Sequence, residues 1–168
     1  MAKYSNKEKI VFKQAEFIEK ATLNFKDGDY TFLITDPEWR ARHTAAIDYK
    51  SASKEKTKRI QILKRTLPKS ERKNFKYLAV PEFNMSDKKT WQLNWHIITN
   101  KKVNYSEIDK TYGGLEIEVI EDIEALAGYL TKHFYITMGP QLGHKVNPFS
   151  SSHNVLNEGD LAYLATFG

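Results

Sequence analysis

Three residues in two neighbouring segments have the side chains of a metal site built from oxygen and nitrogen ligands: Glu82, Asn94 and His96. The run WQLNWHIIT has the β-branched and aromatic composition of a strand. Because side chains alternate along a strand, Asn94 and His96 share one face while Trp95 takes the other. A carboxylate, an amide oxygen and an imidazole on one face would suit Mg²⁺ or Mn²⁺.

The position of Glu82 depends on how its segment pairs with the strand of His96. A short polar loop joins the two segments, which favours an antiparallel hairpin. Pairing Asn84 with Asn94 places Glu82 opposite His96, with Cβ atoms roughly 4.5–5.5 Å apart. A slip of one residue would send Glu82 to the far face. The alternative is that the Glu and His are ordinary solvent-facing residues of an exposed strand.

A candidate nucleophile follows on a predicted helix. Tyr129 lies at the edge of that helix's apolar stripe, and Lys132 is three residues later, on nearly the same face. A cation beside a phenol favours the phenolate and stabilises charge on an attacked phosphate. Tyr112, Tyr135 and Tyr163 are competing candidates without this lysine spacing. The alternative is an amphipathic helix with an edge tyrosine and a surface lysine.

The other four histidines are expected to have lesser roles. His133 follows the Tyr129 motif and could assist it, but we interpret it as a surface residue. His43, His144 and His153 are interpreted as structural or solvent-exposed, although His144 lies beside Lys145 and could touch DNA.

Charge is strongly segregated along the chain. Residues 50–102 contain 15 Lys and Arg against 4 Asp and Glu, a net charge of +11, whereas residues 103–168 have 3 against 9, a net charge of −6. A basic block of this density predicts a polyanion-binding face, and a solvated lysine-rich helix surface is the alternative. The candidate nucleic-acid contacts are Lys54, Lys56, Lys58, Arg59, Lys64 and Arg65.

The predicted elements interleave strands with helices, which indicates the α+β class with one antiparallel β-sheet flanked by helices. Residues 10–20 fit a short helix or a strand, and Asp27–Asp29 fits a turn. In the 115–120 strand, Leu115, Ile117 and Val119 are expected to be buried. We expect strands at 30–36, 75–83, 91–99 and 115–120, helices at 38–66 and 121–134, and a polar turn at 84–90.

Composition excludes several classes of protein. The 168 residues fit a single domain, with a core at about 30–134 and a tail, 135–168, of uncertain structure. The absence of cysteine excludes disulfides and thiolate metal sites. No apolar run is long enough to span a membrane, and the first residues lack a secretory signal. We therefore expect an intracellular protein in the cytoplasm.

Glu82, the NWH run at 94–96 and the YLTK run at 129–132 together resemble the HUH endonuclease superfamily, and most of all its rolling-circle replication initiators. YTFLITD resembles the family's first motif, and residues 114–134 resemble the run that leads into its tyrosine helix. The resemblance covers about residues 30–134 and implies a sheet related to the ferredoxin and RNA-recognition folds.

The resemblance implies an endonuclease that nicks and rejoins single-stranded DNA at a replication origin. Tyr129 would form a covalent 5′-phosphotyrosine with help from Lys132. Glu82, Asn94 and His96 would hold Mg²⁺ or Mn²⁺. A polymerase, and possibly a helicase, of a bacterial host would extend the released 3′-hydroxyl, since the chain has no phosphate-loop motif of its own.

The sequence departs from the family at Asn94, where the first histidine of the metal motif is expected. An amide oxygen is a harder and weaker ligand than imidazole, which should favour Mg²⁺ or Mn²⁺. The departure leaves open a module of the same fold that binds DNA or RNA without cutting. A single-tyrosine transposase, which would be expected to dimerise, also stays open.

Overall fold

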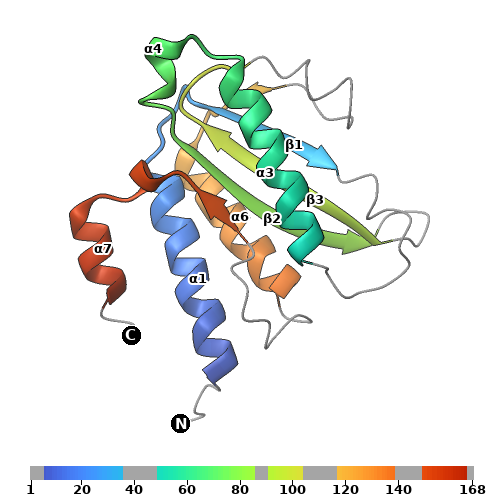
Figure 1. The fold of residues 1–168 in the computed structure, drawn as a ribbon. Coiled ribbons are helices and arrows are strands. Elements are labelled where there is room, and N and C mark those ends of the chain that lie inside the picture. The colour runs from blue at the N-terminus through green and yellow to red at the C-terminus, as the bar shows by residue number, and fades with distance from the viewer. Residues whose placement is uncertain (1–5, 36–48, 86–90, 104–116, 139–148, 166–168) are drawn as a thin grey trace.

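The computed structural model describes residues 6–35, 49–85, 91–103, 117–138 and 149–165. Its centre is a five-stranded sheet in the order β4-β1-β3-β2-β5, and every pair of neighbouring strands is antiparallel. Helices flank the sheet (Figure 1). The predicted α+β class with one antiparallel sheet is confirmed.

The central strands follow the sequence prediction closely. The β2 strand begins two residues later than expected and continues through Asn84 and Met85, which were assigned to the turn. The strands are β1 (Tyr30–Thr35), β2 (Tyr77–Met85), β3 (Trp91–Thr99), β4 (Glu118–Val119) and β5 (Ser150–Ser151).

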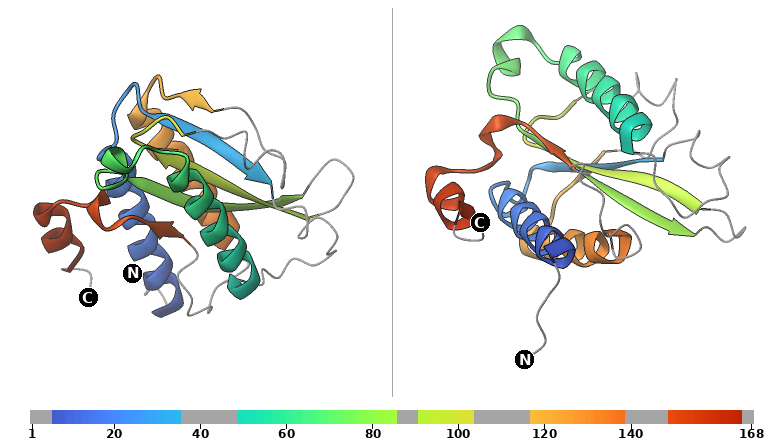
Figure 2. Two further views of the ribbon diagram at one scale, coloured as in Figure 1. Left: turned by 45° about the horizontal axis from the view of Figure 1, so that its top comes forward. Right: turned by 60° about the horizontal axis from the view of Figure 1, so that its bottom comes forward.

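The helices form two layers on opposite faces of the sheet. Figure 2 shows α3 on one side of the strands and both α1 and α6 on the other. The first segment, left open between helix and strand, is a helix, and the part of the predicted 38–66 helix before Tyr49 lies outside the described residues. The helices are α1 (Asn6–Leu23), α3 (Tyr49–Arg65), α4 (Lys69–Arg72), α6 (Ile123–Met138), α7 (Glu158–Ala165) and the 3₁₀ turn η2 (His153–Val155).

The hairpin register differs from the prediction by two residues. Glu82 lies opposite Asn94, and Val80, not Glu82, lies opposite His96. The difference arises because β2 continues to Met85, which pairs with Trp91, the first residue of β3. The connection between the two strands is therefore only residues 86–90. A two-residue slip preserves the face of every side chain, so Glu82 still faces the same way as Asn94 and His96.

The two faces of β3 have different partners. Trp95 and Ile97 are fully buried on one face, and Nζ of Lys56 on α3 lies 5.0 Å from the centre of the Trp95 ring. His96 and Ile98 alternate onto the other face, towards α6. The sheet therefore separates the α3 surface from the α6 surface.

The buried core extends beyond the predicted limits of 30–134. Ile18 on α1 and Met138 near the end of α6 are buried. Phe149 and Val155 from the tail belong to the same cluster, and β5 adds a strand to the sheet. Helix α1 and the tail are thus parts of the folded core.

A turn and an edge strand position the start of α6. Gly28 adopts a φ of 96°, a conformation that favours glycine, and its N–H donates to the carbonyl of Ile120. Asp122 caps α6 by accepting a 3.1 Å hydrogen bond from the N–H of Ala125. The predicted burial is wrong for Val119, which is 57% exposed, whereas Ile117 packs partly buried against the core as expected, and Leu115 lies outside the described residues. Strand β4 pairs with β1 through only two residues, and the N–H of Ile120 then donates to the carbonyl of Asp29.

Among the described strands, only β5 pairs with the outer edge of β2. β5 pairs with Leu78 and Ala79, and Pro81 follows directly beyond this short pairing. Among the described helices, none is long and apolar enough to cross a membrane.

Candidate functional site

Glu82 is the centre of a cluster of polar side chains between the hairpin and α6. Its Oε2 contacts Nε2 of His96, which lies on the diagonally adjacent position of β3. Its Oε1 lies 3.3 Å from Nδ1 of His133 on α6. Glu82 is 8% exposed, so one nearly buried carboxylate connects two strands and a helix.

Tyr129 lies directly beside this carboxylate. Its ring centre is 5.7 Å from that of His96, in an edge-on arrangement, and 4.1 Å from that of His133. The side chain is 42% exposed, as predicted for the edge of an apolar stripe whose neighbour Leu130 is buried. The structure therefore brings Glu82, His96 and Tyr129 together, with the phenol open to a ligand.

The pKa of Tyr129 is shifted in the direction opposite to that expected from a neighbouring lysine. Partial burial raises the pKa above its usual value near 10, and the charge of Glu82 and a hydrogen bond to Glu82 raise it further. Lys132 is exposed, so water screens its charge. In this arrangement Tyr129 is a protonated phenol that donates to a carboxylate.

Of the competing tyrosines, only Tyr135 has a described side chain, and it does not lie in this site. Tyr135 projects from α6 towards α1, where its ring meets Phe12 edge-on at 5.8 Å. The charges of Glu16 and Glu19 on α1 help to raise its pKa, after burial. Tyr112 and the side chain of Tyr163 lie outside the described residues.

His133 was interpreted as a surface residue, but the structure places it in the site. It is four residues after Tyr129, so the two side chains lie about 40° apart around α6. This spacing is the signal by which His133 could have been found. Of the other histidines, His153 is exposed in η2, and His43 and His144 lie outside the described residues.

Asn94 provides an observation with which to test the expected metal. Asn94 is 7% exposed, and its Oδ1 is buried without a hydrogen-bond partner among the described residues. A buried oxygen without a donor fits a position occupied by a cation, and Glu82 directly opposite supplies a carboxylate. Within the described ranges, however, no three His, Cys, Asp or Glu side chains form a group that could hold a metal ion. The donor types of Glu82, Asn94 and His96 fit Mg²⁺ or Mn²⁺. In this structure, however, His96 and Glu82 contact each other directly, so they are not separated as two ligands of one ion would be.

A wide cavity of about 820 Å³ opens on the β4 side of Tyr129. Its charged lining residues are Glu118, Glu121 and Asp122, all acidic, and Thr31 is among the others. This negative lining disfavours a phosphate chain in the cavity itself. A nucleic-acid backbone would have to approach Tyr129 from another direction.

The six predicted nucleic-acid contacts divide into two groups. Lys56 and Arg59 are 3% and 1% exposed, packed under α3, so in this structure they are not placed to meet a phosphate. Charge along the sequence predicts both as contacts, but both side chains are buried in the structure, and Lys56 lies over the Trp95 ring. The exposed members are Lys54, Lys58, Lys64 and Arg65.

Comparison with protein-family models, with curated proteins and with solved structures found no match.

Proposed function

We propose that the chain nicks and rejoins single-stranded DNA through a covalent bond to Tyr129, as a rolling-circle replication initiator of the HUH endonuclease type. The observation that carries the proposal is the convergence of Glu82 and His96 on the β2–β3 hairpin with Tyr129 on α6, which is 33 residues after His96 in the sequence. A half-exposed phenol held against a buried carboxylate is an arrangement typical of nucleophilic catalysis.

In the proposed step, the hydroxyl oxygen of Tyr129 attacks a backbone phosphorus in line with the departing 3′-oxygen. A phosphorus–oxygen bond to tyrosine forms as the bond to the 3′-oxygen breaks, leaving a 5′-phosphotyrosine and a free 3′-hydroxyl. Glu82 already accepts the phenolic hydrogen bond and takes the proton, and the 3′-oxygen is protonated from solvent. One phosphoester replaces another, so the reverse reaction can rejoin the strand.

The remaining residues orient these groups. His96 and His133 each meet a different oxygen of Glu82, which fixes the carboxylate relative to the phenol. Glu82, Asn94 and His96 would hold a divalent ion only after the direct contact between His96 and Glu82 opens, and the ion would then supply positive charge to polarise the scissile phosphate. Lys132, exposed one turn from Tyr129, is available to a phosphate oxygen outside the acidic cavity.

The test compares two tyrosines of the same helix. The protein is incubated with Mn²⁺ and a pool of single-stranded oligonucleotides that carry a random central region and a 3′-end label. Wild type and Tyr135→Phe should give a labelled adduct that survives SDS, and Tyr129→Phe should give none. An adduct of undiminished yield with Tyr129→Phe would refute the assignment of the nucleophile.

A second candidate function is nucleic-acid binding without cleavage, on the same fold. The raised pKa of Tyr129 and the acidic cavity beside it favour this alternative, because both disfavour a phenolate attacking a phosphate. Binding of the oligonucleotide pool with no adduct, in Mg²⁺ and in Mn²⁺, would support it.

A further inference from the structure

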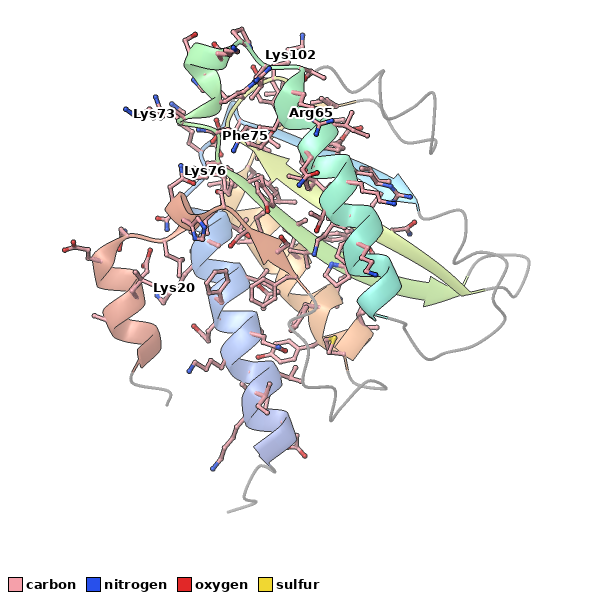
Figure 3. The ribbon with its side chains drawn as sticks, in the orientation of Figure 1. Lys20, Arg65, Lys73, Phe75, Lys76 and Lys102 are labelled. Carbon is pink, nitrogen blue, oxygen red and sulfur yellow. The ribbon has the colours of Figure 1, made fainter. Side chains whose placement is uncertain are left out.

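A second cavity lies at the end of the molecule where α3 ends and β2 begins. It has a volume of about 410 Å³, within the range of about 300–1,000 Å³ typical of ligand sites. Among the described residues, its charged lining consists of Lys64, Arg72 and Lys73, with His153 beside them and no acidic side chain. Figure 3 shows the labelled Arg65, Lys73 and Lys102 at this end of the molecule.

One wall of this cavity is a fixed aromatic surface. The ring of Tyr77 stacks on that of buried Phe75, with centres 5.9 Å apart and an interplanar angle of 26°. The hydroxyl of Tyr77 shares a 3.1 Å hydrogen bond with Oγ of Ser150 in β5. A partly exposed ring held from behind and at its tip is preorganised to stack on another flat group.

One of the cations is also fixed before any ligand arrives. The Nε and Nη2 of Arg72 donate 3.0 Å hydrogen bonds to the carbonyls of Leu67 and Arg65. These bonds use two of the five N–H donors of the guanidinium and set its plane. Lys64 and Lys73 also line the cavity and are exposed to solvent. Their ammonium groups can therefore bind an anion without first being buried.

A row of exposed cations on α3 leads to the cavity. Lys54, Lys58 and Arg65 are spaced four and seven residues apart, which puts them on one side of the helix. The row is about 16 Å long at 1.5 Å per residue. A line of positive charge that ends at an aromatic pocket suits a chain of phosphates carrying an unpaired base better than a single small anion.

We propose that this cavity is a binding site for single-stranded nucleic acid, with one unpaired base stacked on Tyr77 and the neighbouring phosphates held by Lys64, Lys73 and the row on α3. Tyr77 lies opposite Thr99, which shares a face of β3 with Trp95 and so faces α3, whereas Tyr129 belongs to α6 on the other side of the sheet. The site therefore goes beyond the proposed cleavage site and does not depend on strand cleavage. A duplex is a poor occupant because its bases are already stacked and paired.

The test measures the affinity of the full chain for a fluorescein-labelled 20-nucleotide single strand by anisotropy, without divalent ions, at several salt concentrations. Lys64→Glu/Lys73→Glu should weaken binding at least fivefold and reduce the salt slope by about 0.7 for each lost phosphate contact. The matched control, Lys9→Glu/Lys13→Glu on exposed positions of α1, makes the same change in net charge and should stay within twofold of wild type.

The aromatic contact is tested separately. Tyr77→Leu should weaken binding by about 5- to 150-fold, and Tyr77→Phe, which keeps the ring, should bind within twofold of wild type. The lysine variants change only exposed side chains, so they remain informative if Tyr77→Leu does not fold.

Three results would overturn the proposal: equal losses in the cavity and control lysine pairs, unchanged binding by folded Tyr77→Leu, or equally tight binding of the matching duplex. The wild-type chain failing to form the Tyr129 adduct would refute cleavage and leave this test intact. Conversely, if wild type forms the Tyr129 adduct but the cavity variants bind the single strand as tightly as wild type, only the second site would be refuted.

Discussion

Replacing Lys56 with methionine should increase the folding stability of the protein, because Lys56 is a buried cation. A lysine on a DNA-binding face would instead affect nucleic-acid affinity when replaced. Lys56 is 3% exposed, and burial lowers its pKa from 10.5 to about 8. A lowering of this size corresponds to a penalty of about 3 kcal/mol on the charged form. Methionine fills a similar volume without the charge but loses the cation–π contact with Trp95, worth about 0.5–2 kcal/mol. We expect Lys56→Met to raise the free energy of unfolding by about 1–3 kcal/mol at pH 7.

The gain should depend on pH in a defined direction. Because the pKa of Lys56 is lower in the folded state, the unfolded chain holds the proton more tightly between pH 8 and 10.5. The penalty is therefore fully present below pH 8 and disappears as the pH rises to 10.5. At pH 10 the variant's advantage should fall below about 1 kcal/mol.

Urea unfolding followed by tryptophan fluorescence at pH 7 and pH 10 measures both effects. Lys58→Met, two residues later and exposed, is the control and should change stability by less than about 0.5 kcal/mol. If Lys56→Met were less stable than wild type at pH 7, or if its advantage were the same at pH 10, the burial argument would fail. Nucleic-acid affinity provides a second readout, since Lys58→Met should weaken it and Lys56→Met should not.

Three further predictions concern the site and the core. Glu82→Gln removes the charge that helps to raise the pKa of Tyr129, so that pKa should move down towards 10 in a metal-free titration by tyrosine ¹³Cζ NMR; no change would mean that burial alone sets it. Mn²⁺ should raise the melting temperature of wild type and not of His96→Ala, and equal shifts in both proteins would place the ion elsewhere. Phe134→Ala should cost about 3–5 kcal/mol because Phe134 is fully buried, whereas Ile136→Ala, at a position 58% exposed, should cost less than about 1 kcal/mol; similar losses would contradict the assigned core face of α6.

Local sequence patterns predicted the elements of the hairpin and of α6 well. The alternation in β3 and the three- and four-residue spacing in α6 are properties of single segments, and they placed His96 and Tyr129 on the correct faces. The register was beyond this reasoning, because it depends on how far both strands extend towards their loop. Glu82 kept its face only because the error was an even number of residues.

Relations between elements were the main source of error. Charge alone cannot show which side of α3 packs on the sheet, so Lys56 and Arg59 were grouped with the exposed cations. Nor does a count of charges along the chain show that the basic helix and Tyr129 lie on opposite faces of the sheet. His133 was considered as an assistant to Tyr129 but interpreted as a surface residue, although a residue four positions from Tyr129 is its neighbour on a helix.

Pro81 has a consequence for how this chain behaves beside other copies of itself. β5 pairs with β2 only at Leu78 and Ala79. Beyond Ala79, no described strand pairs with the outer edge of β2. Proline has no N–H to offer, and it interrupts the ladder that an incoming strand would need. Pro81 is itself buried, so restoring the amide with Pro81→Val should promote edge-to-edge self-association where local opening exposes this edge, seen as a concentration-dependent rise in light scattering in mild urea.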